Sequence, residues 1–491
     1  MPGETSETLR QLIRSRIRSH PFVAVSNREP YLNTWQDGKL AWMRPASGLV
    51  VALDPVMRAS RGLWVAQGDG TADRAACDEN GFVDVPPGDP RYRLKRVWLT
   101  DEEVENYYYG FANSALWPLC HVAYQRPVFR HDDWRAYREV NEKFAESVAR
   151  EVGNEKAFIF IQDYHFALLP RLLRQRCPRA VIAHFWHIPW PNPEVFRICP
   201  WKQEILRGLL GSDILGFHIR YHGDNFIAAV DQELEARMDR ERAAIVFERH
   251  MTKIRAFPIS IDFDAVARQA ASEDTEERMK AIRARYGIGE EIILGVGADR
   301  IDYTKGLPER IEAVDRFLDR YPEFRRRFVF FQAGVPSRTH VDAYRQLNET
   351  LDGAVRRVNA KYGEPGWCPI LFLREHLPLA ELLAWYRLAR FAIVSSLHDG
   401  MNLVAKEFVA ARVDGSGVLL LSRFTGAARE LRDAVPINPY ATDDVATAIR
   451  LAIDMTPEEA GRRMRKMREQ VRERNVYRWA SDIVRKLSKL A

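Results

Sequence analysis

The sequence of 491 residues lacks several features that would place it in a specialised class of protein. Its five cysteines are odd in number and include no CxxC pair, which argues against a disulfide framework and against a cysteine zinc site. No apolar run approaches the roughly 18 residues of a membrane span, and the first twenty residues have no apolar signal-peptide core. We therefore expect a cytoplasmic protein that does not associate with a membrane.

Two further absences narrow the class of protein. The chain has no internal repeat or low-complexity tract, and with 46% hydrophobic and 29% charged residues it is neither disordered nor collagen-like. It also has neither a Walker A nor a GxGxxG phosphate-binding loop. Any phosphate group would therefore have to be bound in another way.

The charge of the chain is only mildly positive. Lys and Arg total 73 against 67 Asp and Glu, which leaves a formal charge of +6. A basic surplus suits an anionic partner, but this one is spread along the chain, and aromatic residues make up 11%. Phosphorylated small molecules are therefore favoured over nucleic acid as partners.

Short apolar runs alternate with longer amphipathic segments along most of the chain, which is typical of βα units around parallel sheets. The expected strands are 22–25, 158–161, 181–186, 214–217, 292–296, 328–331, 370–373, 391–394 and 418–421. The expected helices are 133–151, 166–175, 307–320, 340–360, 379–388 and 402–412. This pattern predicts an α/β fold with doubly wound sheets, and two such domains facing one another would form a cleft for ligands.

A proline-broken extended segment, RAFPISIDF, separates the two βα series and places the main boundary near Ile261. Leu9, Ile13 and Ile17 recur at helical spacing, which favours a short helix docked on the fold over one that binds an anionic surface. The expected divisions are a helical extension 1–20, two α/β domains 21–260 and 261–456, and C-terminal helices 457–491 that pack on the body.

Two expected strand ends in the first half carry polar side chains. Asp163 follows the strand FIFI, where a carboxylate could bind a sugar hydroxyl or accept a proton, or could simply cap the next helix. His187 follows the strand VIAHFW and precedes a stiff proline-rich loop. A single histidine in aromatic surroundings is more often structural, so this residue alone decides nothing.

The second half carries two stronger clusters. Arg300 and Lys305 lie five residues apart on a loop that leads into a helix, where two cations form an anion site suited to a diphosphate. After the strand FAIVSS, Gly400 frees the backbone to turn, and Glu407 on the following helix could reach a sugar hydroxyl pair. Together these features predict a metal-free site for a nucleotide sugar, in which the cations neutralise the leaving diphosphate.

The motifs at these positions resemble those of the trehalose-6-phosphate synthases, which are retaining glycosyltransferases of the GT-B fold. The resemblance extends from about Val23 to Leu487. The motifs, in order, are SNREP (26–30), ASGLV (46–50), YYYGFANSALWP (107–118), QDYHFALLP (162–170), HIPWPNPEVF (187–196), DRIDYTKGLPER (299–310), KYGEPGW (361–367) and HDGMNLVAKE (398–407). The resemblance implies two facing Rossmann-like domains with an interdomain cleft, the first for the acceptor and the second for the nucleotide sugar.

The resemblance also implies a role for each matching residue. The implied catalytic residues are Asp163, which contacts the acceptor sugar, His187, which lies near the 6-hydroxyl and anomeric centre of the donor glucose, and Asp399, near the donor glucose hydroxyls. The implied donor-binding residues are Gly48, Arg300, Lys305, Asn402, Leu403, Val404 and Glu407. The implied acceptor-binding residues are Arg28, Gln67, Tyr108, Trp117, Asp163 and Arg338. No metal and no cofactor is implied.

Gln67 departs from the family pattern, because relatives carry a tryptophan at the corresponding position. The resemblance implies transfer of glucose from a nucleoside diphosphate glucose, with UDP-glucose preferred, to glucose 6-phosphate, which gives α,α-trehalose 6-phosphate with retention. Gln67 keeps open a glucosylglycerol-phosphate synthase, which uses ADP-glucose and glycerol 3-phosphate. An inactive sugar-phosphate-binding regulator is a third alternative. The partners are small molecules, and the oligomeric state stays open.

Overall fold

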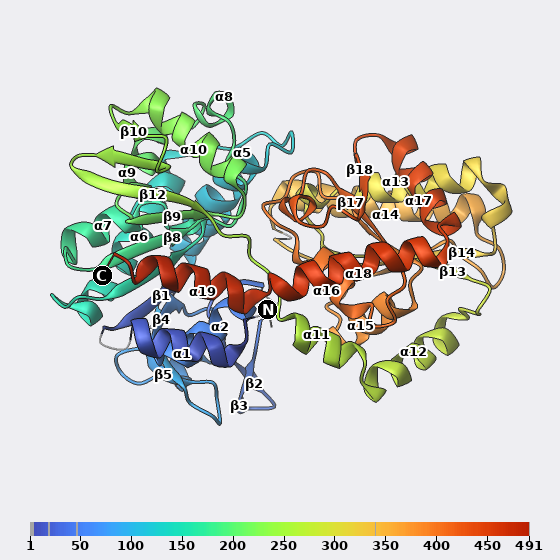
Figure 1. Cartoon of the computed structure of the whole chain (residues 1–491), viewed down its shortest axis with the longest axis horizontal. Coiled ribbons are helices and arrows are strands. Elements are labelled where there is room, and N and C mark those ends of the chain that lie inside the picture. Colours follow the sequence, from blue (N-terminus) through green and yellow to red (C-terminus); the bar gives the residue numbers. More distant parts are fainter. Residues whose placement is uncertain (1–3, 18–19, 46–47, 339, 491) are drawn as a thin grey trace. The chain divides into compact units, whose positions relative to one another are not determined.

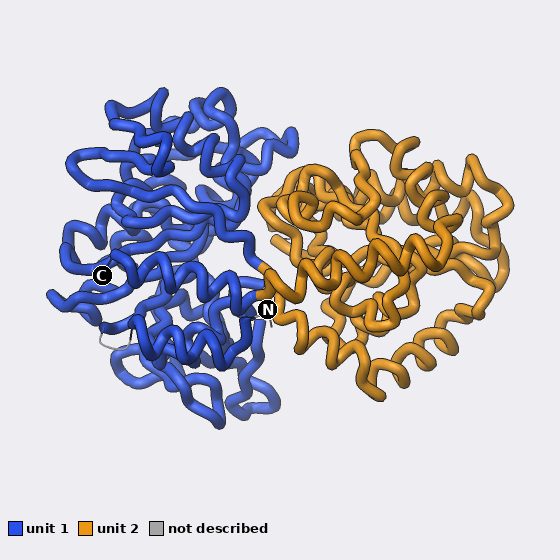
Figure 2. Tube along the Cα trace, viewed as in Figure 1, with its two compact units in different colours: residues 1–259, 476–491 blue, residues 260–475 orange. Residues whose placement is uncertain are grey.

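The structure of the protein, a computed structural model, describes residues 4–17, 20–45, 48–338 and 340–490. The chain forms two compact units (Figure 2). Unit 1 consists of residues 1–259 and 476–491, and unit 2 of residues 260–475. None of the helices in the described part of the chain is both long and apolar enough to cross a membrane.

A ten-stranded sheet forms the centre of unit 1 (Figure 1), with the strand order β10-β11-β12-β9-β8-β7-β1-β4-β6-β5. The strands are β1 (Phe22–Ser26), β4 (Leu63–Gln67), β5 (Phe82–Val85), β6 (Tyr92–Val97), β7 (Phe158–Gln162), β8 (Val181–Phe185), β9 (Ile214–Phe217), β10 (Arg237–Asp239), β11 (Ala244–Phe247) and β12 (His250–Ala256). The seven strands from β12 to β6 are parallel, whereas β5, β10 and β11 pair antiparallel.

The central strands of this sheet are almost continuously apolar. All five residues of β1, β7 and β8 are buried, as expected of parallel strands covered on both faces. In the register between β1 and β7, Phe22 pairs with Phe158 and Val25 with Ile161. A separate antiparallel hairpin is formed by β2 (Leu32–Gln36) and β3 (Lys39–Met43).

Helices cover the sheet of unit 1. They are α1 (Ser6–Arg16), α2 (Gly48–Ser60), α3 (Asp73–Ala76), α4 (Asp101–Glu103), α5 (Trp117–His121), α6 (His131–Val152), α7 (Leu169–Arg176), α8 (Pro193–Phe196), α9 (Lys202–Leu209), α10 (Arg220–Glu233) and the C-terminal α19 (Val476–Leu487). α1, α2 and α19 pack together (Figure 1), and α6 and α9 each pack against α7. Leu9, Ile13 and Ile17 are buried, so the N-terminal segment is a docked helix.

Unit 2 is built on a six-stranded parallel sheet with the order β15-β14-β13-β16-β17-β18. Its strands are β13 (Ile293–Arg300), β14 (Phe328–Val335), β15 (Ile370–Leu373), β16 (Phe391–Val394), β17 (Val418–Ser422) and β18 (Val435–Ile437). Numbered within the unit, this order is 3-2-1-4-5-6, that of a Rossmann fold. The helices are α11 (Phe263–Ala270), α12 (Glu273–Tyr286), α13 (Leu307–Arg320), α14 (Asp342–Tyr362), α15 (Leu379–Leu388), α16 (Leu403–Ala411), α17 (Thr442–Asp454) and α18 (Pro457–Glu473).

The boundary between the units falls between Ile259 and Ser260, where the sequence placed it near Ile261. The C-terminal block expected over 457–491 is divided: α18 belongs to unit 2, whereas α19 belongs to unit 1. An amphipathic pattern shows that a helix packs but does not show against which core. The cleft expected between two facing domains stays a prediction.

Each sheet has one point where successive crossovers leave in opposite directions. In unit 1 this switch lies between β1 and β7, and in unit 2 it lies between β13 and β16. Ligands of open parallel sheets bind at the carboxyl ends of the strands beside such a switch. The topology therefore predicts that ligands bind near the residues that follow these four strands.

The return of α19 to unit 1 can be tested through Trp479, which is 3% exposed and contacts Phe160 and Phe185 with ring centroids 6.2 and 5.6 Å away. We expect Trp479→Ala to lower the free energy of unfolding by about 3–5 kcal/mol, because it leaves a cavity in the core. Urea denaturation followed by circular dichroism measures this change.

Lys486→Ala is the matched control, because Lys486 is exposed on the same helix. It should change the free energy of unfolding by less than about 0.5 kcal/mol. Equal stabilities of the Trp479→Ala variant and the parent chain would contradict a core role for α19.

Candidate functional site

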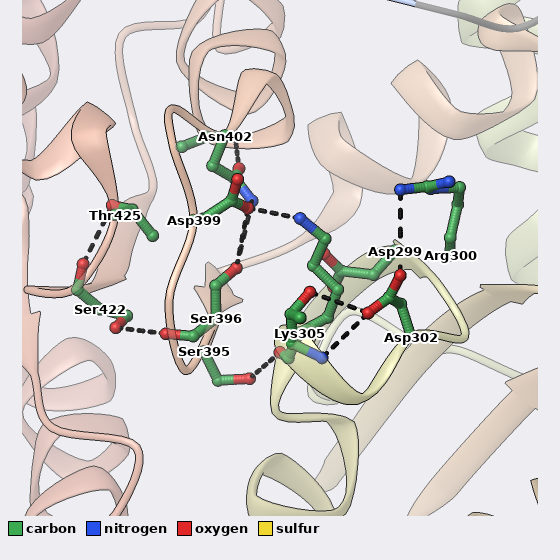
Figure 3. A network of polar contacts seen from close by, with 12 residues as sticks. Asp299, Arg300, Asp302, Lys305, Ser395, Ser396, Asp399, Asn402, Ser422 and Thr425 are labelled. Carbon is green, nitrogen blue, oxygen red and sulfur yellow. Dashed lines mark hydrogen bonds and ion pairs between the residues drawn. The ribbon is translucent and has the colours of Figure 1, made fainter. Parts of the chain in front are cut away.

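An ion pair joins the two loops that meet at the switch point of unit 2. Lys305 Nζ donates to Asp399 Oδ2 at 2.5 Å (Figure 3). Both side chains are only 13% exposed. Ser396 Oγ and Asn402 Nδ2 donate to the same oxygen at 3.2 and 3.3 Å. The ammonium group is therefore fixed at the end of the sheet, where it can meet an anion.

Gly306 allows the lysine loop to lie this close to the loop after β16. It has a φ of 63°, and a Cβ atom there would lie 2.3 Å from the Ser395 carbonyl oxygen. Any other residue would be strained in backbone conformation and would also clash. Ser395 Oγ donates to the Gly306 carbonyl at 2.7 Å, which ties the two loops together.

The loop after β16 leads directly into α16. Its unusual backbone conformation lies at Asn402, with a φ of 102°, and not at Gly400, where the sequence suggested it. Asn402 Oδ1 caps the helix by accepting from the Ala405 N–H at 3.0 Å. Leu403 and Val404 form the first turn, where backbone N–H groups have no partner within the helix and favour an anion.

Glu407 lies one turn further along α16 and is partly exposed. Burial raises the pKa of its carboxyl group to about 7. Its neighbour Lys406 is buried and donates to Glu430 at 2.6 Å, so the helix presents the carboxylate and the ammonium to different surroundings. A carboxylate with such a pKa gains from any hydroxyl group that donates a hydrogen bond to it.

Asp302 connects the two arginines predicted to bind substrate in unit 2. Its Oδ2 lies 4.0 Å from Arg300 Nη2 and 3.5 Å from Arg338 Nη1, and it accepts from the Tyr344 hydroxyl at 3.1 Å. Burial alone would raise its pKa, but Arg338, Arg300 and Lys305 together hold the pKa below its usual range. The residues predicted for the donor and for the acceptor phosphate thus share one charged carboxylate.

Asp163 lies at the switch point of unit 1, directly after β7, with a φ of 71°. Its Oδ1 accepts from the backbone N–H of Tyr164 at 2.9 Å and from that of His187 at 3.0 Å. The carboxylate therefore does cap the short helix Tyr164–Phe166, and it also joins the ends of β7 and β8. A strained backbone held by several contacts is typical of a functional position.

His187 is partly exposed, and its ring lies 4.5 Å from that of Phe185 and 5.4 Å from that of His218. Burial and the neighbouring histidines His218, His184 and His165 lower the pKa of its imidazole well below the usual range. The ring is therefore neutral near pH 7. A neutral imidazole can both donate and accept a hydrogen bond.

A π-helix carries the tyrosine predicted to bind the acceptor. It spans Val104–Leu116, and the side chains of Asn113 and Ser114 donate to the carbonyls of Tyr108 and Tyr109, five residues before them, at 2.7 and 2.6 Å. Helices of this wide type are rare and often mark functional sites.

The ring of Tyr108 stacks on that of His165 with an interplanar angle of 7°. Arg28 Nη2 donates to the Tyr108 hydroxyl at 3.3 Å. The loop after β1 and the π-helix thus place a guanidinium and a phenol together, a pair suited to a phosphate.

The loop that carries Arg28 is anchored by its neighbour Glu29. The Glu29 carboxylate accepts from Arg96 Nε at 2.6 Å and from the Asp69 N–H at 3.1 Å. The Gln67 N–H donates to the Asn27 carbonyl at 3.2 Å. These contacts bring the predicted acceptor residues Arg28 and Gln67 to adjacent strand ends.

The remaining predicted site residues are less closely associated with these clusters. Trp117, at the start of α5, is 6% exposed, and its ring packs on His121 and Tyr164 with centroids 4.1 and 5.7 Å away. Gly48 is exposed at the start of α2, next to residues 46–47, which lie outside the described ranges. Arg338 belongs to unit 2, whereas the other residues assigned to the acceptor belong to unit 1.

Sequence reasoning missed Asp302 and the π-helix. Asp302 lies within DRIDYTKGLPER, but only the structure shows that it faces both Arg300 and Arg338. No local signal predicts a π-helix, although Asn113 and Ser114, each five residues after the carbonyl that it bonds, are consistent with one. Among the described residues, no group of three or more His, Cys, Asp or Glu side chains is placed to hold a metal ion.

Two doubly wound sheets, each with polar residues and cations at its switch point, agree with the GT-B fold expected from the sequence. The profile of Glycosyltransferase family 20 matches residues 20–489. The chain therefore belongs to glycosyltransferase family 20.

Individual relatives agree with this membership. The chain is 38% identical to a trehalose-6-phosphate synthase of Mycobacterium avium over 94% of this chain and 93% of the relative, and 39% identical to that of Mycolicibacterium smegmatis over 94% and 90%. A solved E. coli structure, described as trehalose-6-phosphate bound with UDP-2-fluoro glucose, has a TM-score of 0.86 at 29% identity, covering 96% of this chain and 99% of that one.

A second solved structure is an α,α-trehalose-phosphate synthase (UDP-forming) of Burkholderia xenovorans in complex with glucose-6-phosphate. It has a TM-score of 0.84 at 30% identity and covers 95% of this chain and 99% of that chain. The GT-B class predicted from the sequence is confirmed by these similarities.

The role of Asp302 can be tested by Asp302→Asn, which keeps the shape of the side chain and removes its charge. We expect a loss of about 3 kcal/mol in the free energy of unfolding at pH 7, because two nearby arginines lose their shared carboxylate. Since the pKa of Asp302 is lowered in the folded chain, the difference should persist above the unfolded pKa of about 3.9 and shrink below it.

Urea denaturation at pH 7 and at lower pH measures both effects. The control is Asp342→Asn, because Asp342 forms an exposed ion pair with Arg345 and contributes about 0–1 kcal/mol. A loss that is the same for both variants would contradict a central role for Asp302.

Proposed function

We propose that the protein is a retaining glucosyltransferase that forms α,α-trehalose 6-phosphate from a nucleoside diphosphate glucose and glucose 6-phosphate. UDP-glucose is the proposed donor. The observation that carries the proposal is the cationic switch point of unit 2, where Lys305 is fixed on Asp399 beside Arg300 and the first turn of α16. Membership in family 20 supports the same reaction.

The proposed chemistry requires neutralisation of a leaving diphosphate. Arg300, Lys305 and the N–H groups of Leu403 and Val404 would bind the diphosphate and stabilise the charge that grows on it. The acceptor hydroxyl would attack the anomeric carbon on the face that the diphosphate leaves. A leaving phosphate oxygen would take the acceptor proton, so the bond forms with retention and without a protein nucleophile.

The sugar residues are proposed to be oriented by three side chains. Asp163 would contact the acceptor sugar, His187 the donor glucose near its anomeric centre, and Asp399 the region of the donor hydroxyls. Asn402 and Gly48 are proposed to complete the donor site. Asp163, His187, Asp399 and Asn402 each lie on a loop that follows a strand of one of the two large sheets.

The acceptor phosphate is proposed to bind Arg28, Tyr108 and Arg338, with Trp117 and Gln67 as walls of the pocket. Gln67 alone favours the second candidate, glucosylglycerol-phosphate synthesis, because an amide replaces an aromatic wall. The similarity to trehalose-6-phosphate synthases over more than nine tenths of the chain favours glucose 6-phosphate.

We also propose that the enzyme is cytoplasmic and works without a metal ion. The absence of any paired cysteine among the five supports a reducing compartment. Its partners are proposed to be small molecules.

The proposed reaction is tested by incubating purified protein with UDP-, ADP- or GDP-glucose and either glucose 6-phosphate or glycerol 3-phosphate, and identifying products by NMR. We expect trehalose 6-phosphate with at least one donor. Arg300→Ala should lower kcat/KM by about 100- to 1000-fold, because it removes charge stabilisation from the leaving group.

Arg316→Ala is the matched control, since Arg316 forms exposed ion pairs on α13 in the same unit. It should leave kcat/KM unchanged. Activity with glycerol 3-phosphate but not with glucose 6-phosphate would show that glycerol 3-phosphate is the acceptor. Absence of product with every pair of donor and acceptor would refute the proposed reaction.

The raised pKa of Glu407 predicts a pH dependence of donor binding. We propose that its carboxylate accepts hydrogen bonds from the ribose hydroxyls, which favours the charged form. Affinity for UDP-glucose should therefore rise a few-fold from pH 6 to pH 8, as Glu407, with a pKa of about 7 in the free protein, loses its proton.

Calorimetry in buffers of different ionisation enthalpy measures both the affinity and the proton released. Glu407→Gln should abolish the pH dependence and weaken binding about tenfold at pH 8. Glu323→Gln, at an exposed ion pair with Arg450, is the control and should behave like the parent. An unchanged pH dependence in Glu407→Gln would exclude this carboxylate from the donor site.

A further inference from the structure

Gln162 is a buried polar residue that has no role in the proposed mechanism. It ends β7, immediately before Asp163, and its side chain is 0% exposed. Its Oε1 lies 2.9 Å from His187 Nε2. Among the described residues its Nε2 has no hydrogen-bond partner, so the contact with His187 is the side-chain interaction that offsets the cost of burying this amide.

This contact determines which nitrogen of His187 carries a hydrogen. An amide oxygen can only accept, so Nε2 of the imidazole must donate. A neutral imidazole has one N–H, which leaves Nδ1 as an acceptor. The ring is partly exposed, and no hydrogen bond to Nδ1 is found within the described ranges.

The rest of the residue is held as firmly as the ring. The His187 N–H donates to Asp163 Oδ1 at 3.0 Å, and the ring packs edge-on against Phe185 with centroids 4.5 Å apart. Backbone, ring plane and tautomer are thus set by three different neighbours. A hydrogen-bond acceptor fixed in this way is suited to orienting one hydroxyl group.

We propose that Gln162 is a positioning residue that holds His187 in the tautomer whose Nδ1 accepts a hydrogen bond from a hydroxyl of the bound sugar. The inference rests on the proposed glucosyl transfer, because it is the sugar that supplies the hydroxyl. Gln162 itself does not contact the substrate. It acts entirely through His187.

The first test is Gln162→Met, which keeps the length of the side chain and removes the amide. We expect kcat/KM to fall about 10- to 100-fold, because the ring loses the partner that selects its tautomer. The matched control is Gln203→Met on α9, which removes a partly exposed amide that donates to the Glu233 carbonyl at 3.1 Å, outside the site. It should leave kcat/KM unchanged. Parental kcat/KM in Gln162→Met would overturn the inference.

A second variant, Gln162→Glu, separates positioning from general packing. A carboxylate beside Nε2 stabilises the imidazolium and so raises the pKa of His187. In the parent, burial and the neighbouring His218, His184 and His165 lower this pKa. The Asp163 carboxylate also lies against this residue, where it accepts from the His187 N–H. Below that pKa both ring nitrogens carry hydrogens and Nδ1 cannot accept.

Donor binding by the parent already depends on pH through Glu407, so the activity of Gln162→Glu is compared with that of the parent at the same pH. Relative to the parent, it should be lost at low pH and recover as the pH rises. A loss that is the same at every pH would mean that Gln162 only fills space.

The tautomer can also be observed without any assay of activity. Protein labelled with nitrogen-15 in its 12 histidines gives separate Nδ1 and Nε2 signals, and comparison with His187→Asn assigns those of His187. We expect Nε2 protonated and Nδ1 unprotonated in the parent. The opposite tautomer would overturn the inference even in an active glucosyltransferase, whereas the expected tautomer in a protein that makes no trehalose 6-phosphate would refute only the proposed reaction.

Discussion

Parallel pairing of β13 with β16 is the constraint on which the site of unit 2 depends. These strands are far apart in the sequence, and their register, in which Gly295 pairs with Phe391, places their carboxyl ends side by side. The loops that follow then lie within reach of one another, which allows Lys305 to pair with Asp399. Without this pairing the cations and the first turn of α16 would serve no common site.

In unit 1, parallel strand pairing also brings two loops together, but other local structures complete the site. β1 and β7 pair in parallel, and the loops after them carry Arg28 and Asp163. The π-helix then brings Tyr108 to Arg28, and its extra width is held by Asn113 and Ser114. The polar cluster at the carboxyl end of this sheet therefore depends on hydrogen bonds from two side chains to backbone carbonyls of the π-helix.

The sequence predicts the central strands well, because buried parallel strands such as Phe158–Gln162 and Phe391–Val394 are short apolar runs between amphipathic helices. It does not predict β6, in which the charged residues Lys95 and Arg96 are buried through specific partners. It also does not predict β4, a five-residue strand of mostly apolar residues.

For the site, residue types at strand ends indicate Asp163, His187, Arg300, Lys305 and Glu407. The pairing of Lys305 with Asp399, the sharing of Asp302 by two arginines and the contact between Gln162 and His187 depend on distances between side chains. These distances cannot be predicted from the spacing of the residues along the chain.

The division of unit 1 into residues 1–259 and 476–491 has a consequence for synthesis on the ribosome. Unit 2 is a continuous segment, so its core needs no residue made after Asn475. Unit 1 is different, because its core includes Trp479 of α19, which is made after the whole of unit 2. The N-terminal unit therefore cannot complete its core before unit 2 has been made, against the usual order in which domains fold from the N-terminus.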